Sequence, residues 1–231
     1  MIEAHRQTSY GVRLEWGPTG AAAIADGADI AVVVDVLSFT TTVTVALEQG
    51  IAVKPALWDD GRAEVRRLDV PGLSPASMRR ASGVDRLVLP SPNGSTICTL
   101  LADAGLTVVG ASLRNATAVA AWLAPRIAGG AHVAVVAGGE RWPDGSLRPA
   151  VEDLWGAGAV IARIESDLSP EARMARDAFA AADLPAALAA CASGRELVDR
   201  GFAEDVEIAG ELDRSSVVPV LDEERWFGTG G

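Results

Sequence analysis

Two nearly unbroken apolar runs constrain the fold of this chain more than any other feature. They cover residues 30–37 and 131–137, and each is far shorter than the ~20 residues that a membrane-spanning helix requires. Short continuous apolar runs are typical of strands that are buried on both faces of a parallel sheet. Helix-like segments alternate with these and other strand-like runs along the chain. The sequence therefore predicts an α/β fold with a largely parallel sheet.

The remaining elements follow from the hydrophobic pattern and from turn residues. The segment 38–49 is the hardest to assign, because residues 40–45 are all β-branched and propensity alone favours a strand. Its position between two strand-like runs decides for a helix. Residues 69–85 are expected to form a long loop and the Gly-rich C-terminal end to fray. Strands are expected at 11–16, 51–57, 86–89, 106–110 and 217–221, and helices at 59–68, 95–104, 115–127 and 151–164, with further helix starts at Ser169 and Ser193.

Composition narrows the class of protein. A length of 231 residues with 49% hydrophobic and 22% charged residues fits a single domain over residues 1–231. The net charge of −11 argues against a general nucleic-acid binder, which needs a basic face.

No signal peptide or membrane span is visible, so a cytoplasmic location without membrane partners is expected. Cys98 and Cys191 have no metal or redox spacing and are expected to be half-buried thiols. Six Trp leave room for a homodimer interface.

Asp35 ends the first apolar run and begins a series of three polar clusters at strand ends. A carboxylate at the end of a buried strand is costly unless it accepts hydrogen bonds or binds a cation. One interpretation is a Mg²⁺ ligand, because this ion takes one or two carboxylates together with water and phosphate. The other is a cap on the following helix, and the residues alone leave both open.

The second cluster is the segment 91–96, Ser-Pro-Asn-Gly-Ser-Thr, which opens a helix. First-turn backbone amides there suit a phosphate or a sulfonate, and an ordinary loop with a helix cap is the alternative. The segment lacks the Gly-x4-Gly-Lys pattern of a Walker loop. No His stands where it would complete a nucleophilic triad. The amides concerned belong to Gly94, Ser95 and Thr96.

The third cluster follows the second apolar run. Glu140 comes after two glycines, and Glu152 and Asp153 lie in the first turn of a predicted helix, where the helix dipole alone can explain them. The glycines later in that helix are expected to permit close packing or close ligand approach. Since the carboxyl ends of parallel strands share one crevice, the three clusters are expected to meet and to form an enzyme site.

The residues of these clusters and their order along the chain resemble those of the 2-phosphosulfolactate phosphatase (ComB-like) family. The resemblance runs through DVLSFTTTVTVAL, SPNGST, AGGE with VEDLWGAGAVIA, and the ending SGRELVDRGFAEDVEIAGELDRSSVVPVL. It implies a three-layer α/β/α fold and Mg²⁺-dependent hydrolysis of a small anionic phosphorylated substrate. The chain departs from the family at Ser38, where Arg is frequent, at 72–75 and at 92–95. These departures fall where a substrate would be recognised, so they bear on substrate identity more than on phosphatase chemistry.

The resemblance, together with the expectation that positive side chains bind an anionic substrate, assigns roles to individual residues. The metal would be held by Asp35 with Glu152 or Asp153, and Glu140 would orient water or act as a general base. The two alternatives are a non-catalytic binder of an anionic metabolite and a lyase or isomerase acting on a phosphorylated hydroxy acid. The expected substrate-binding residues are Ser38, Asn93, Gly94, Ser95, Thr96, Arg114 and Arg141, of which the two arginines are assigned by charge alone.

Overall fold

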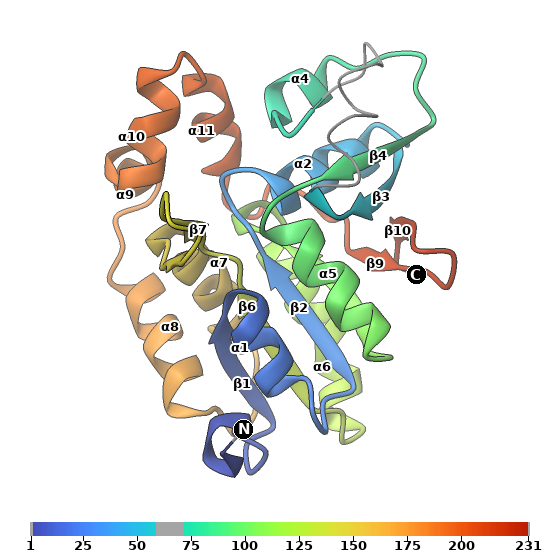
Figure 1. The fold of residues 1–231 in the computed structure, drawn as a ribbon, viewed down its shortest axis with the longest axis vertical. Coiled ribbons are helices and arrows are strands. Elements are labelled where there is room, and N and C mark those ends of the chain that lie inside the picture. Colours follow the sequence, from blue (N-terminus) through green and yellow to red (C-terminus); the bar gives the residue numbers. More distant parts are fainter. Residues whose placement is uncertain (1, 59–71, 231) are drawn as a thin grey trace.

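A computed structural model describes residues 2–58 and 72–230, and in this part of the chain eight strands form one sheet (Figure 1). The strand order is β1-β6-β2-β5-β9-β10-β3-β4. Four neighbouring strands run parallel: β1 (Val12–Trp16), β6 (Val133–Ala137), β2 (Ile30–Val34) and β5 (Thr107–Ala111). Every residue of β2 and β6 is buried, as their apolar runs predict. The prediction of an α/β fold with a largely parallel sheet is confirmed.

A second parallel pair, β3 (Ala52–Ala56) and β4 (Arg86–Pro90), joins the first block through two short strands. These are β9 (Pro219–Leu221) and β10 (Phe227–Thr229), and each is antiparallel to both of its neighbours. The three antiparallel steps reverse the direction of β3 and β4 relative to β2. In Figure 1 these two strands lie beside α2 and not alongside β2. The loop after β4 still reaches the end of β2, since the Gly94 amide donates to Asp35, so these clusters meet although the two strands are not parallel.

The Gly-rich segment forms a strand as far as Thr229, which corrects the expectation that these residues fray, and Gly231 lies outside the described residues. Phe227 is fully buried, pairs with Val53 of β3 and packs edge-on against the Phe39 ring at 6.2 Å between centroids. A Gly-rich sequence predicts flexibility, but one buried aromatic ring inside a sheet stabilises the segment through long-range contacts.

Helices cover both faces of the sheet, so the three-layer arrangement is confirmed. One apolar core includes residues of α1 (Gly17–Ile24), α2 (Phe39–Glu48) and α5 (Gly94–Asp103) with one face of the strands. The other includes residues of α6 (Ala116–Ala128), α7 (Val151–Ile161) and α8 (Pro170–Ala180) with the opposite face. In the described residues, no helix is both long and apolar enough to cross a membrane.

The α2 helix forms in spite of its β-branched sequence because its threonine hydroxyls find backbone acceptors. Thr40 Oγ1 donates to the Asp35 carbonyl at 2.8 Å, Thr41 Oγ1 to the Val36 carbonyl at 2.7 Å, and Thr44 Oγ1 to the Thr40 carbonyl at 2.8 Å. These bonds allow fully buried threonines to pack in the helical layer. They also join the start of α2 to the end of β2, where the first polar cluster lies.

Most of the smaller elements lie near the upper end of the sheet in Figure 1, and η1 lies at the lower end beside the N-terminus. A short hairpin of β7 (Glu140–Arg141) and β8 (Leu147–Arg148) occupies the predicted loop before α7. Helix α4 (Pro75–Arg79) lies within the predicted loop 69–85, and the predicted helix 59–68 lies outside the described residues. The remaining elements are the 3₁₀ turns η1 (Glu3–Arg6) and η2 (Leu113–Asn115) and the helices α9 (Ala186–Ala190), α10 (Ala192–Asp199) and α11 (Ala203–Ala209).

The glycines of α7 and both cysteines have structural roles. A Cβ on Gly156 would lie 2.5 Å from Val36 Cγ2 and 2.7 Å from Val34 Cγ1, so this glycine permits close packing of α7 on the sheet. Cys98 and Cys191 are buried free thiols, and burial is the main cause that raises the pKa of each, for Cys191 to about 11. Neither thiol is ionised near neutral pH, so neither is a ready nucleophile.

Candidate functional site

Asp35 joins two of the three polar clusters. Its Oδ1 accepts hydrogen bonds from Ser38 Oγ at 3.0 Å and from the Phe39 amide at 3.4 Å. Its Oδ2 accepts from the Gly94 amide at 3.0 Å and from Ser91 Oγ at 3.4 Å. The bond to Phe39 is the helix-cap role left open by the sequence. The contacts on Oδ2 go beyond capping, because they bring in a loop from a different strand.

Gly94 fits this position because it has no side chain. A Cβ there would lie 2.5 Å from Phe39 Cδ1 and 2.7 Å from Asp35 Oδ2, which is too close for either neighbour. The Gly94 amide is used by Asp35, so it is not a free donor for an anion as the sequence suggested. This hydrogen bond and the close packing at Gly94 instead hold the loop after β4 against the end of β2.

The hydroxyls of the 91–96 loop stabilise the loop itself. Ser95 Oγ donates to the carbonyls of Ala56 at 2.6 Å and Ser91 at 2.8 Å, and Thr96 Oγ1 donates to the Ser91 carbonyl at 3.2 Å. Ser95 is fully buried. Asn93, in contrast, turns its side-chain amide toward the third cluster. Of the polar side chains in this loop, Asn93 is therefore the best placed to meet a ligand.

Asp153 connects the third cluster to the first. Its Oδ1 accepts from the Val36 amide at 2.7 Å and its Oδ2 from the Gly139 amide at 2.8 Å. The neighbouring Glu152 is buried, and its Oε2 accepts from Cys191 Sγ at 3.5 Å. Both carboxylates lie in the first turn of α7, yet Asp153 stabilises the ends of β2 and β6 and not only its own helix. The three clusters therefore meet, as the sequence predicted.

Burial makes Asp35 and Asp153 reluctant to ionise. Burial is the largest cause that raises the pKa of Asp35 above its usual value, against the lowering effect of its hydrogen-bond donors. Burial, followed by the charges of Asp35 and Glu152, raises the pKa of Asp153 well above its usual value. A bound cation would offset this accumulation of like charge.

Glu140 stands between this buried group and solvent. Its Oε2 accepts a hydrogen bond from Asn93 Nδ2 at 3.2 Å. Burial, then the charges of Asp35 and Glu152, raise the pKa of Glu140 from 4.5 to about 7, while Arg148 and Asn93 act in the opposite direction. A carboxyl group with a pKa near the pH of the solution can both accept and release a proton during a reaction. The β7–β8 hairpin, which the sequence did not indicate, places it there.

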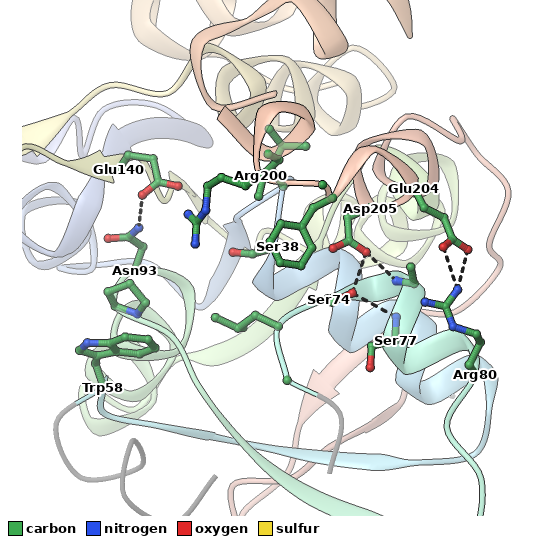
Figure 2. A pocket seen from close by; sticks show the side chains of 18 residues that line it. Ser38, Trp58, Ser74, Ser77, Arg80, Asn93, Glu140, Arg200, Glu204 and Asp205 are labelled. Carbon is green, nitrogen blue, oxygen red and sulfur yellow. Dashed lines mark hydrogen bonds and ion pairs between the residues drawn. The ribbon is translucent and has the colours of Figure 1, made fainter. Parts of the chain in front are cut away.

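A cavity of about 730 Å³ opens beside Glu140 (Figure 2). This volume is that of a site for a small molecule. One side is formed by the strand-end loops, and the other by α4, the α10–α11 corner and α11. Asp205 joins the two helices of the far side by accepting from Ser74 Oγ at 2.8 Å and from the Ala76 amide at 2.9 Å. The lining residues are Leu37, Ser38, Trp58, Gly72, Leu73, Ser74, Ala76, Ser77, Arg80, Pro92, Asn93, Glu140, Leu197, Arg200, Gly201, Phe202, Glu204 and Asp205.

The carboxylates at this site could supply one or two ligands to a metal ion, but not a complete set of protein ligands. In the described residues, no group of three or more His, Cys, Asp or Glu side chains is placed to hold a metal ion. The close pair is Asp35 and Asp153, since a Cβ on Gly138 would lie 3.4 Å from both Asp35 Cβ and Asp153 Oδ2. Each oxygen of Asp153 accepts one hydrogen bond and keeps a further lone pair, whereas each oxygen of Asp35 accepts two and would give one up to bind a metal ion. Mg²⁺ uses one or two carboxylates with water, so these residues fit it in that form.

The two arginines assigned by charge alone lie elsewhere. Arg114 is buried and its guanidinium pairs with Glu48 at 2.9 Å and with Glu211, which leaves it no role at the cavity. Arg141 is exposed, donates to the carbonyls of Gly145 and Pro92, and lines a separate hollow of about 300 Å³ behind Asn93. Sequence reasoning missed Arg200 and Asp205, although both lie in the C-terminal segment that carries the family resemblance.

Comparison with known proteins agrees with the resemblance. A family model described as 2-phosphosulpholactate phosphatase matches residues 63–224. A protein of Pseudothermotoga lettingae named "Probable 2-phosphosulfolactate phosphatase" is 30% identical to this chain over 99 residues. That alignment covers 42% of this chain and 42% of the relative, so the chain matches less than half of the relative's length.

Proposed function

Because this chain belongs to the 2-phosphosulpholactate phosphatase family, we propose that it hydrolyses the phosphate ester of a small acidic hydroxy acid. 2-Phosphosulfolactate is the first substrate to assay, since the family and the Pseudothermotoga lettingae relative carry that name. The observation that carries the proposal is Glu140, which has a pKa of about 7 and lines a cavity of about 730 Å³ beside buried carboxylates.

In this proposal Glu140 takes a proton from the attacking water. A base is most effective when its pKa lies near the working pH, and Glu140 meets this condition through burial and neighbouring charge. The side chains of Asn93 and Ser38 line the same cavity and would donate hydrogen bonds to phosphoryl oxygens, for which Ser38 would turn its one hydroxyl hydrogen away from Asp35 Oδ1. Asn93 would then exchange its bond with Glu140 for one with the substrate, or make both with its two amide hydrogens.

Mg²⁺ is the cofactor that we propose for this reaction. Asp35, with Glu152 or Asp153, would hold it, and when bound it would supply charge neutralisation for the phosphoryl group and a more acidic water. The support is the raised pKa of Asp35 and Asp153, which reflects buried carboxylates that lack a counter-charge. Asp35 would also keep the β4 loop in position through its bond to Gly94.

The test is release of inorganic phosphate from 2-phosphosulfolactate by the purified chain, after treatment with EDTA and after addition of Mg²⁺. We expect activity that depends on Mg²⁺ and that falls at least 100-fold in Asp35→Asn, in line with the loss of an electrostatic contact at a reacting centre. The matched control is Asp183→Asn, which alters an exposed Asp between α8 and α9. Equal activity of Asp35→Asn and wild type would contradict the assigned role.

The alternatives from the sequence give different results in the same assay. Thermal stabilisation by 2-phosphosulfolactate without phosphate release would identify a binding protein. Consumption of the substrate without phosphate release would identify a lyase or an isomerase. Either result would overturn the phosphatase proposal while leaving the cavity as the site.

A further inference from the structure

If the ligand carries a second negative charge beside its phosphate, the cavity needs a positively charged side chain to bind that charge. Three carboxylates line it, those of Glu140, Glu204 and Asp205, and the whole chain carries a net charge of −11. Such a surface repels an anion unless a local positive charge compensates. Among the described lining residues the cations are Arg80 and Arg200.

Arg80 is already neutralised within the cavity wall. Its Nη1 donates to both carboxylate oxygens of Glu204 at 2.8 Å, and Glu204 lines the same cavity. This pair joins α4 to α11, next to the bond between Ser74 and Asp205. A ligand that bound Arg80 would therefore have to displace a carboxylate that remains beside it.

Arg200 has a weaker partner, and that partner lies outside the cavity lining. Its Nη1 pairs with Glu196 at 3.1 Å, one turn earlier in the chain, and the two side chains are 63% and 60% exposed. An exposed pair at this spacing contributes little to stability, and solvent screens it. The guanidinium can therefore leave Glu196 for a ligand anion at small cost. The Arg80–Glu204 pair is equally exposed, at 63% and 55%, but Glu204 lines the cavity and would remain beside any anion that bound Arg80.

The backbone holds Arg200 at a rigid corner between α10 and α11. The Phe202 amide donates to the Leu197 carbonyl at 2.8 Å and the Gly201 amide to the Val198 carbonyl at 3.0 Å, which together form a Schellman motif. Gly201 has φ of +88°, a left-handed conformation that favours glycine. Figure 2 shows the Arg200 side chain extending into the cavity, toward the side that holds Glu140, Asn93 and Ser38.

We propose that Arg200 binds the second anionic group of the substrate, a carboxylate or a sulfonate, while the phosphoryl group lies against Asn93 and Ser38. This inference rests on the proposed function and assigns its substrate specificity to the α10–α11 corner. A guanidinium suits both groups because its fork of N–H donors matches two oxygens at once. The site thus selects a short phosphorylated hydroxy acid with a second charge, and discriminates against neutral phosphomonoesters.

The kinetic test compares three phosphomonoesters that differ in their second charge: 2-phosphosulfolactate, 2-phospholactate and glycerol 2-phosphate. For Arg200→Gln we expect kcat/KM to fall about 10- to 100-fold on the substrates whose charged group Arg200 contacts, the size of a lost hydrogen bond to a charged group. For glycerol 2-phosphate we expect a change of less than about 2-fold. A loss on 2-phosphosulfolactate alone assigns the sulfonate, and a loss on both acidic substrates assigns the carboxylate.

Two further variants separate recognition from a structural role. Arg200→Lys should recover part of the loss. The double variant Arg80→Gln/Glu204→Gln, which removes the neutral pair from the same cavity without changing its net charge, should not change the preference among the three substrates. Arg200 also ends α10, where a cation interacts favourably with the helix dipole. If that were its only role, Arg200→Gln would lower activity on all three substrates equally or on none, and either result would overturn the proposal.

A binding measurement keeps this test independent of catalysis. Sulfolactate, which is the expected product without the phosphate, should raise the melting temperature of the wild type and of the Arg80→Gln/Glu204→Gln double variant but not that of Arg200→Gln. If the wild type hydrolyses none of the esters, the proposed function fails, and selective loss of this stabilisation still supports the role of Arg200. If sulfolactate and 2-phosphosulfolactate both fail to stabilise the wild type, the role of Arg200 is overturned.

Discussion

Replacing Glu140 by Gln should make the protein more stable at alkaline pH while it removes the proposed base. The side chain is partly buried, and its pKa is raised from 4.5 to about 7 by burial and by the charges of Asp35 and Glu152. The folded state therefore holds the proton more tightly than the unfolded chain. Between pH 4.5 and about 7 the folded protein binds more protons than the unfolded one, so its free energy of unfolding falls as the pH rises.

The structure also sets the size of this effect. One pKa unit corresponds to about 1.4 kcal/mol, so the difference between 4.5 and about 7 corresponds to about 3 kcal/mol once Glu140 is ionised. Gln keeps a carbonyl oxygen that can accept the hydrogen bond from Asn93, so the variant loses the charge and little else. We expect Glu140→Gln and wild type to have similar stability at pH 4.5, and the variant to be more stable by about 3 kcal/mol at pH 8.

Urea denaturation in the presence of EDTA, at several pH values from 4.5 to 8.5, measures this difference directly. Glu223→Gln, in the exposed turn between β9 and β10, is the matched control and should stay within about 0.5 kcal/mol of wild type at each pH. A difference between Glu140→Gln and wild type that does not change with pH would refute the reasoning. A variant less stable than wild type at pH 8 would also refute it.

Three further changes test the site and its surroundings. The logarithm of kcat/KM should rise with pH in the wild type until Glu140 is ionised, at a pKa that bound Mg²⁺ would lower from about 7 by offsetting the charges of Asp35 and Glu152, and a pH profile of Glu140→Gln should lack this limb. Gly94→Ala should lower the melting temperature strongly, because its Cβ would lie 2.5 Å from the Phe39 ring, while Gly228→Ala, with no atom within 4 Å, should not. Arg114→Met should destabilise the fold by about 2 kcal/mol or more in urea denaturation, with little change in kcat/KM.

Contrary results would be equally informative. An unchanged acid limb in Glu140→Gln would assign the titration to another group. A wild-type melting temperature for Gly94→Ala would mean that the β4 loop can move away from Asp35. A selective loss of activity in a stable Arg114→Met would restore the substrate-binding role that charge logic gave to this arginine.

Local patterns predicted most of the elements because helices and strands are encoded over short stretches of chain. The buried strands 30–34 and 133–137 follow from continuous apolar runs, and the helix cap at Ser169 follows from its hydroxyl, which accepts from the Ala172 amide. The end of the chain escaped prediction, since β10 is stabilised by the burial of Phe227 between distant strands. The β7–β8 hairpin, with two residues in each strand, is too short to leave a periodic signal.

The candidate site divides in the same way. The sequence by itself determined which carboxylates follow buried strands. The residues of the three clusters and their order along the chain determined the family. Only the tertiary structure decided that Asp35 meets Gly94 and Asp153 bonds to Val36, because these bonds join residues 59 and 117 positions apart. It also decided that Arg114 belongs to the framework and that Arg200 faces the cavity. The role of an arginine depends on which carboxylates surround it after folding, and no local pattern carries that information.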